Sequence, residues 1–381
     1  MIYLDNAATT FPKPDIVLNT MNIYMREHGA NPGRGGYEMA IAAGAVIQKT
    51  RDELALLINA DDSMRISFTK NATEALNIGI LGILRKGDHV VTTCMEHNSV
   101  LRPLHYLASN KIISVSYAKA DKYGFVDSQT ISKLIKRKTK MIICTFSSNV
   151  TGAVQPIREI GELASKSGII FLVDGAQGIG SKPIDVKKMN IDILAFPGHK
   201  GLFGPQGTGG LYVTKGLEIT PLMFGGTGSL SGQAKQPEFM PDIFESGTLN
   251  TPGIAGLGEG IKFIQKSEII NIEKYKNILI TRLYRGLNNI PGVKIFGPSD
   301  HKLNSGIISI SMQNLDSAEV SNILDEKFNI ATRPGLHCAP LAHKNLGTFE
   351  IGLVRFSVSY LNSIEDIDSA IKAIEEISIM H

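Results

Sequence analysis

Short apolar runs alternate with amphipathic stretches between Arg65 and Val213. Each run is bounded by polar or turn-forming residues, as buried strands are. Amphipathic stretches at 73–85, 128–137 and 157–167 lie between several of them and predict helices. Such alternation predicts an α/β fold with a mostly parallel seven-stranded sheet covered by helices. The expected strands are 65–69, 89–94, 112–117, 140–146, 169–174, 192–196 and 209–213.

The pattern changes after Val213. Helical periodicity dominates from Gly253 to about Asn289. Strands are then expected at 293–296, 306–312 and 353–358, with helices at 317–328 and 364–379. These elements are too few to extend the first sheet, so they predict a smaller C-terminal α+β domain. We expect a large domain over 14–255 and a small domain formed by 1–13 and 256–381.

Composition narrows the class of protein. The net charge of +3 gives no electrostatic reason for a nucleic-acid or membrane partner, and no apolar run reaches the roughly 18 residues of a membrane span. The N-terminus lacks the basic and apolar regions of a secretory signal. Three cysteines in 381 residues cannot form a disulfide framework. Together these features indicate a cytoplasmic protein.

Two charged residues follow neighbouring apolar strands. Asp174 ends one strand, where open α/β sheets place ligands. It could ligate a metal, cap a helix or pair with a protonated ring nitrogen. Lys200 follows the next strand beside Gly201, where partial desolvation favours a nucleophilic amine, although a surface lysine is the alternative. A carboxylate and an amine placed this way are what pyridoxal phosphate (PLP) chemistry requires.

A third strand end carries a helix start. Asn71 and Glu74 resemble a capping box, and the free amides with the Thr73 hydroxyl make a phosphate seat as well as an ordinary cap. His97 follows the strand at 89–94. It is either a satisfied polar residue or an imidazole that stacks on a planar cofactor and moves protons.

The segment from Arg333 to Pro340 holds the third cysteine. Cys94 and Cys144 lie in apolar strands and are expected in the core. Cys338 lies in a Gly- and Pro-rich loop, where Arg333 and His337 could act as cations that favour its thiolate. No second cysteine or suitably spaced histidine pair supports a zinc site. Arg355, inside an apolar strand, needs an anion: a substrate carboxylate or a structural partner.

Several segments together resemble the cysteine desulfurase and selenocysteine lyase branch of the class V aminotransferase family. They are residues 3–10, 173–177, 198–200, 244–251, 333–338 and 355–357, so the resemblance runs along nearly the whole chain. The spacing from Arg333 to Cys338 is similar to the group that carries its cysteine on a short loop. The resemblance implies PLP as cofactor on the type I fold.

The resemblance also implies roles around the cofactor ring. Lys200 is expected to form the Schiff base, and Asp174 to pair with the pyridine nitrogen. Gln177 is expected to bond the phenolic oxygen, and His97 to stack on the ring.

For the phosphate, the resemblance implies the amide of Ala72, Thr73, His199 and, across the interface of a homodimer, Thr248. Pro197 stands where the family often has a phosphate-binding serine, which puts one contact in doubt.

For the substrate, the resemblance implies that Asn149 and Arg355 grip a carboxylate, with Arg333 nearby. Cys338 is expected to take sulfur from L-cysteine, leaving L-alanine and a persulfide for an acceptor protein. L-selenocysteine as substrate, a β-eliminating C–S lyase or an epimerase on the same scaffold remain alternatives. A non-catalytic scaffold is disfavoured by the presence of Lys200, Asp174 and Cys338.

Overall fold

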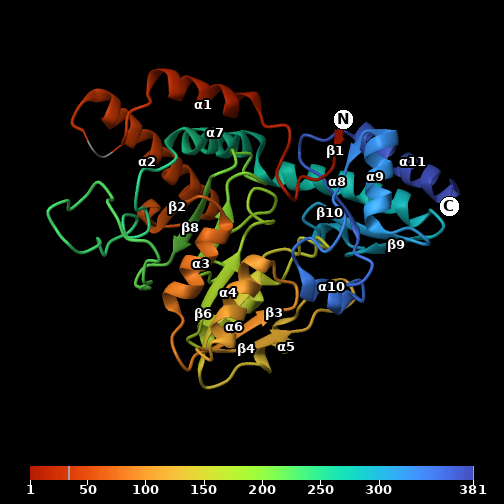
Figure 1. The fold of residues 1–381 in the computed structure, drawn as a ribbon, viewed down its shortest axis with the longest axis horizontal. Coiled ribbons are helices and arrows are strands. Elements are labelled where there is room, and N and C mark those ends of the chain that lie inside the picture. The colour runs from red at the N-terminus through yellow and green to blue at the C-terminus, as the bar shows by residue number, and fades with distance from the viewer. Residues whose placement is uncertain (33–34, 381) are drawn as a thin grey trace.

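The computed structural model describes residues 1–32 and 35–380. Two sheets of different size organise the chain, the larger on the left of Figure 1 and the smaller on the right. The larger sheet has seven strands in the order β2-β8-β7-β6-β5-β3-β4. β8 runs antiparallel to β2 and β7, whereas the other neighbours are parallel. The predicted mostly parallel sheet is confirmed, with strands β2 (Ile66–Thr69), β3 (His89–Thr93), β4 (Ser114–Ala118), β5 (Thr139–Thr145), β6 (Ile170–Asp174), β7 (Ile193–Pro197) and β8 (Gly209–Val213).

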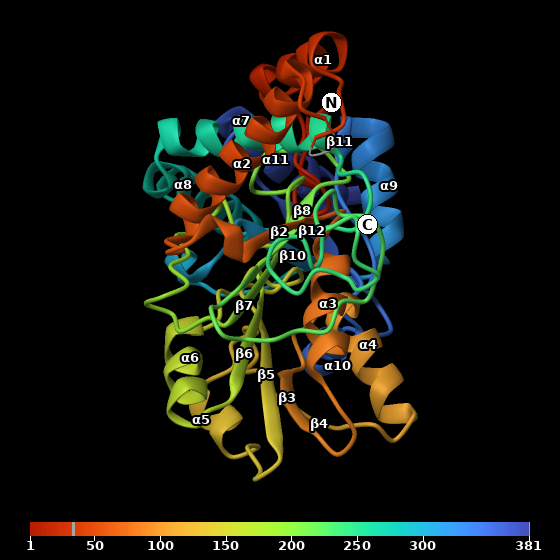
Figure 2. The same ribbon diagram turned by 90° about the vertical axis from the view of Figure 1, so that its left-hand side faces the viewer.

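Helices bury both faces of this sheet, as Figure 2 shows. α3 (Ala72–Ile83) and α4 (Asn98–Ser109) lie on one face, while α5 (Ser128–Ser132) and α6 (Ile157–Lys166) lie on the other. Along β6, Leu172 packs in the core between the sheet and helices α3 and α4, and Phe171 packs in the core between the sheet and helices α5 and α6. Both alternating sets of side chains are therefore apolar, which is why the strands read as continuous apolar runs.

Some helices differ from the sequence pattern. The helix expected at 128–137 ends at Ser132, because the chain then turns through successive bonds such as Leu134 N to Ile131 O (3.0 Å) to enter β5. Helices before residue 65 were not expected. α1 (Asp15–Glu27) and α2 (Glu38–Ile58) pack on α7 (Thr251–Ser267) at the top of Figure 1.

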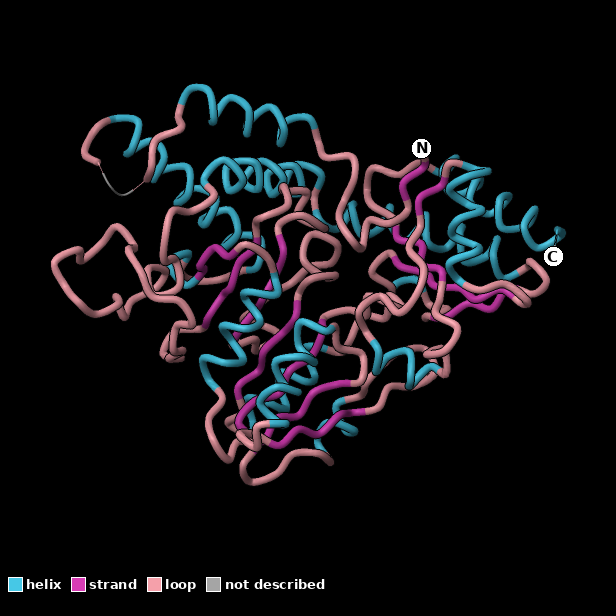
Figure 3. Tube along the Cα trace, viewed as in Figure 1, coloured by secondary structure: helices cyan, strands magenta, loops and turns pink. Residues whose placement is uncertain are grey.

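The smaller unit is an antiparallel sheet with helices, visible as the separate group of strands in Figure 3. β1 also pairs with β11 in parallel, so the N-terminal strand lies against this unit. That pairing supports the predicted boundary after residue 13, and both boundaries stay a prediction. The elements are β1 (Ile2–Tyr3), α8 (Ile269–Asn288), β9 (Val293–Phe296), β10 (Ile307–Met312), α9 (Ser317–Phe328), β11 (Ile330–Ala331), α10 (Pro340–Leu346), β12 (Val354–Ser357) and α11 (Ile364–Met380), with a 3-10 turn at His301–Leu303. Another 3-10 turn, Ser63–Arg65, precedes β2 in the larger unit.

The two units meet where the parallel strands end. Arg355 Nη1 in β12 donates to Asn149 O after β5 (3.1 Å), and Lys276 Nζ in α8 donates to Ser181 Oγ after β6 (2.8 Å). Ligand sites of open α/β sheets lie at this edge. Among the described residues, no helix has both the length and the apolar character needed to cross a membrane.

Candidate active site

Asp174 is the last residue of β6 and is almost fully buried. Its Oδ1 accepts a hydrogen bond from Ala176 N (2.9 Å), so the carboxylate also caps the turn that follows the strand. Burial raises its pKa, while the bond from Ala176 and the charge of Lys200 oppose that shift. A buried carboxylate next to an amine suits the binding of a cationic ring nitrogen.

Lys200 lies three residues beyond the end of β7. Its backbone is held because its carbonyl accepts from Thr10 Oγ1 (2.8 Å) and from Phe203 N (3.0 Å). Burial lowers the pKa of Lys200 to about 8, and the charge of Asp174 offsets part of that shift. More of this amine is neutral at pH 7 than of a surface lysine, as a Schiff-base lysine requires.

His97 is the N-cap of α4, and its ring is fixed by Ser99, which the sequence reasoning missed. Ser99 N donates to His97 Nδ1 (3.1 Å), so the ring proton sits on Nε2. The Ser99 hydroxyl lies 2.8 Å from both His97 Nδ1 and Thr73 Oγ1. Burial, followed by the charge of Lys200, lowers the pKa of His97 to about 4. The imidazole is therefore neutral, and it is linked to the start of α3 through one hydroxyl.

The start of α3 has the features of an anion seat. Asn71 Oδ1 accepts from Glu74 N (2.9 Å), and Glu74 Oε2 accepts from Lys70 N (2.6 Å), so the carboxylate reaches one residue further back than in an ordinary capping box. Ala72 and Thr73 are the first two helical residues. Backbone amides at this end of a helix favour a bound phosphate.

His199 brings a second nitrogen toward the site. Its Nδ1 is buried and has no hydrogen-bond partner among the described residues. Its carbonyl accepts from Thr10 N (3.1 Å) and from Lys13 Nζ (2.7 Å), which fixes the backbone. Burial lowers the pKa of His199 to about 4, so it is a neutral donor or acceptor. Pro197 ends β7 beside it, and its effect on phosphate binding stays a prediction.

Arg355 is fully buried beside the N-terminal segment. Its Nη2 donates to Asp5 Oδ1 (2.6 Å), so the alternative of a structural ion pair is realised. Its Nε has no hydrogen-bond partner among the described residues, which leaves a buried donor for an anion. The sequence reasoning gave Asp5 no role, although the resemblance included its segment, because the pairing joins positions 350 residues apart.

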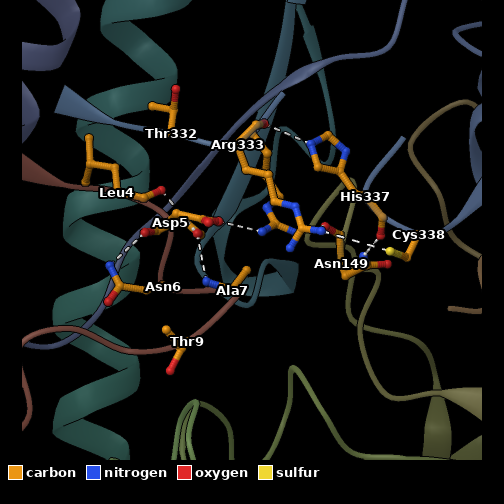
Figure 4. A network of polar contacts seen from close by, with 12 residues as sticks. Leu4, Asp5, Asn6, Ala7, Thr9, Asn149, Thr332, Arg333, His337 and Cys338 are labelled. Carbon is orange, nitrogen blue, oxygen red and sulfur yellow. Dashed lines mark hydrogen bonds and ion pairs between the residues drawn. The ribbon is translucent and has the colours of Figure 1, made fainter. Parts of the chain in front are cut away.

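Figure 4 shows the loop that carries Cys338 beside Asn149. Cys338 is exposed, whereas Cys94 and Cys144 are buried as expected. Its Sγ lies 4.0 Å from Arg333 Nη2. The Cys338 carbonyl accepts from Asn98 N (2.8 Å), next to His97 in the chain.

Asn149 holds the same loop, since its Nδ2 donates to His337 O (2.6 Å). His337 and Cys338 have φ values of 51° and 57°. This left-handed conformation costs about 1–2 kcal/mol for each residue that is not glycine. The loop keeps this conformation because the surrounding hydrogen bonds fix it.

One expectation about the thiol is wrong. His337 was expected to act as a cation beside Cys338, but burial and the charge of Arg355 lower its pKa to about 3. The neutral ring instead donates from Nε2 to Arg333 O (2.9 Å). Arg333 places positive charge beside the thiol.

Two further ligands of the cofactor were expected, of which Gln177 lines the same small cavity as Lys200. Gln177 Nε2 donates to Ala7 O (3.0 Å), so the N-terminal segment holds its side chain. Thr248 is exposed, and its hydroxyl lies 3.4 Å from Asn31 Nδ2. Its role toward a second subunit stays a prediction. Within residues 1–32 and 35–380, no cluster of His, Cys, Asp or Glu is suited to a metal ion.

Known proteins resemble this chain along its whole length. The chain is 40% identical to a probable cysteine desulfurase of Methanothermobacter thermautotrophicus, covering 100% of this chain and 95% of that protein. It is 32% identical to a cysteine desulfurase of Methanosarcina thermophila over 99% of this chain and 91% of that protein. An apo cysteine desulfurase structure from Thermococcus onnurineus superposes with a TM-score of 0.93 at 34% identity, covering 100% of this chain and 95% of that one.

The family model of class V aminotransferases matches residues 2–369. That span includes every residue of the clusters around Asp174, Lys200, Arg355 and Cys338. The chain therefore belongs to the class V aminotransferase family, in the branch that holds the cysteine desulfurases.

Proposed function

We propose that this protein is a PLP-dependent cysteine desulfurase, which converts L-cysteine to L-alanine and keeps the sulfur as a persulfide on Cys338. One observation carries the proposal. The exposed thiol lies 4.0 Å from Arg333, on a loop bonded to the residue that follows His97. A nucleophile is thus held next to the groups expected to bind the cofactor and substrate.

The residues present fit PLP. The seat offers a buried carboxylate at Asp174, an amine of lowered pKa at Lys200 and free amides at the start of α3. His199 Nδ1, buried without a partner among the described residues, is the kind of polar atom that a phosphate would satisfy. When bound, PLP supplies an electron sink for negative charge at the substrate α-carbon.

The protein side chains supply proton transfer and orientation. The Lys200 amine, partly neutral near pH 7, removes the α-proton of the substrate. Asp174 keeps the ring nitrogen protonated through its charge. His97 is neutral with its proton on Nε2, which suits an imidazole that stacks on the ring.

The buried arginine suits a substrate carboxylate. Arg355 Nε has no partner among the described residues, and Arg355 Nη1 donates to the backbone carbonyl of Asn149. Arg333 adds a second positive charge at the thiol. The two arginines carry two positive charges and Asp5 carries one negative charge, so the charge of one substrate carboxylate would balance the site.

Sulfur transfer then balances without an added oxidant. The Cys338 thiolate attacks the substrate sulfur, a new S–S bond forms and the substrate C–S bond breaks. The electron pair stays on the substrate carbon, which takes up protons and leaves as alanine. Holding both sulfurs in one site makes the attack intramolecular, an effect worth up to about 7–11 kcal/mol.

The functional unit in the proposal is a homodimer, in which Thr248 serves the partner's phosphate. Large apolar side chains that are exposed on one copy would be covered in such a dimer. They come from α1, α2 and the segment before α7, and include Ile16, Leu18, Ile23, Met25, Met39, Ile41, Phe224 and Leu230. Mixing Lys200→Ala with Thr248→Ala subunits should restore native sites in hybrid dimers. An active monomer by light scattering would contradict the dimer.

The persulfide sulfur passes to an acceptor protein, for which the exposure of Cys338 provides access. All three cysteines are free thiols, which suits a reducing cytoplasm.

Product analysis tests the proposal. Purified protein loaded with PLP and given L-cysteine should release alanine, and formation of pyruvate would favour a β-eliminating lyase instead. Parallel assays with L-selenocysteine decide which chalcogen is the better substrate.

A further inference from the structure

A chain of buried hydrogen bonds connects α10 with the loop that carries Cys338. His337 Nδ1 lies 3.4 Å from His343 Nε2, and His343 Nδ1 lies 2.8 Å from Thr348 Oγ1. At the other end, His337 Nε2 contacts Arg333 O (2.9 Å). The three side chains are 4%, 0% and 1% exposed, so water does not compete for these bonds. None of them takes part in the chemistry described above.

The protons in this chain can be assigned from the last partner backward. The carbonyl of Arg333 can only accept, so the His337 proton is on Nε2 and its Nδ1 accepts. For the 3.4 Å contact with His337 to be a hydrogen bond, His343 donates from Nε2 and accepts at Nδ1. Both histidines are neutral, because burial lowers the pKa of each. The Thr348 hydroxyl therefore donates to His343, and every member of the chain has one fixed role.

The chain ends on a carbonyl that cannot take up a proton. It is therefore a positioning device and not a path for protons to the thiol. Arg333 O also accepts from Arg355 N (2.9 Å). The bond from His337 thus fixes the loop against the strand that carries Arg355, the arginine proposed for the substrate carboxylate.

The loop needs such support because two successive residues, His337 and Cys338, are left-handed. Their carbonyls are held by Asn149 Nδ2 (2.6 Å) and by Asn98 N (2.8 Å). Those bonds hold the backbone from the side of the large sheet. The His337 side chain is the member that ties the loop to Arg333 and, through His343, to α10.

We propose that His343, assisted by Thr348, is a positioning residue for Cys338. By donating to His337 it keeps the loop in its left-handed conformation and keeps the Cys338 thiol beside Arg333. This inference rests on the proposed function for its catalytic meaning, but its geometry can be tested without turnover.

The test compares two alkylating reagents on the holoenzyme. Iodoacetate is an anion and iodoacetamide is neutral, so the ratio of their rates reports positive charge near the thiol, independent of the thiolate fraction. Cys94 and Cys144 are buried, and the reaction therefore reports Cys338. Loss of one unit charge a few ångströms away should lower the ratio about fivefold.

His343→Leu should show this fall, because leucine cannot donate to His337. His343→Gln keeps a donor at the position of Nε2 and should retain most of the parent ratio. His89→Leu is the matched control. His89 is equally buried and has hydroxyl partners on both ring nitrogens (2.8 and 2.9 Å), but it lies at the start of β3. It should lose stability and keep the ratio.

A folded His343→Leu protein with the parent ratio would overturn the proposal. If that variant does not fold, Thr348→Val decides, since it removes only the hydroxyl. We expect about a twofold fall, and an unchanged ratio would overturn the proposal equally.

Turnover provides a separate readout. His343→Leu should lower kcat for L-cysteine about tenfold, with KM and PLP affinity unchanged. Should the parent produce pyruvate, the proposed function fails while the alkylation result still decides the role of His343.

Discussion

The cofactor seat and the cysteine loop are built in opposite ways. Asp174 and Lys200 follow regular parallel strands, so their positions come from the sheet. Cys338 lies in a loop whose conformation depends on side chains from other segments, such as Asn149 and His343. The seat tolerates changes in its surroundings because backbone pairing sets it. The loop depends on a few specific bonds, and its loss should leave the seat intact.

The largest effect is expected on the seat. Lys200→Ala removes the amine that forms the Schiff base and takes the α-proton, so activity should fall by at least about 10³-fold. The visible absorbance band that borohydride removes from the parent should also be lost.

Lys372→Ala, an exposed lysine on α11, should keep both properties. Alkylation of Cys338 by iodoacetamide should remain unchanged in Lys200→Ala. A strong change there would mean that the seat and the loop are not independent.

Cys338→Ala removes the reactive thiol from the loop. This variant should bind PLP and substrate normally but lose alanine production from L-cysteine by at least about 100-fold, since no sulfur acceptor remains. Some activity on L-selenocysteine should survive, because selenium is the better leaving group.

Cys94→Ala removes a buried thiol instead and should retain activity, which makes it the matched control. Parent-like turnover of L-cysteine by Cys338→Ala would show that this cysteine is a bystander.

Asp5 joins the two regions through its ion pair with Arg355. Asp5→Asn leaves a buried guanidinium without its counterion and should reduce the free energy of unfolding by about 2–4 kcal/mol. Urea unfolding measures this change.

The control is Asp61→Asn, which breaks the exposed pair with Lys187. It should cost less than about 1 kcal/mol. Equal losses in both variants would mean that the Arg355 pair is not a structural requirement of the site.

Glu96, the residue before His97, should make the stability of the protein depend on pH. Burial raises its pKa from 4.5 to about 8, although hydrogen bonds from Thr93 and Thr145 oppose the shift. The folded protein keeps this proton up to about pH 8, whereas the unfolded chain releases it near 4.5. The stability that Glu96 contributes is therefore fully present below pH 4.5 and is lost as pH rises toward 8.

Glu96→Gln removes this titration. Between about pH 5 and pH 8, the free energy of unfolding of the parent should fall by about 1–3 kcal/mol more than that of the variant. Parallel pH profiles for the two proteins would show that Glu96 is ionised in the folded state.

Sequence reasoning reached the sheet because its signal is local. Apolar runs located all seven strands of the larger sheet, and the ends of β6 and β7 directed attention to Asp174 and Lys200. It failed for α1 and α2, both of which pack on α7.

The site shows the same division. The sequence indicated Cys338 as the reactive thiol, but it gave His337 a charge that burial removes. Asp5, Ser99 and His343 went unnoticed because their roles depend on which atoms they meet. Their contacts either join segments that are distant in the chain or depend on the tautomer of a buried histidine ring.

The central claim, that Cys338 receives the sulfur, has one direct test. One equivalent of L-cysteine should be added to the PLP-loaded protein without an acceptor, followed by peptide mass spectrometry and product analysis. The account predicts one extra sulfur atom on the Cys338 peptide and one equivalent of alanine. Pyruvate as product, with no sulfur on Cys338, would contradict it.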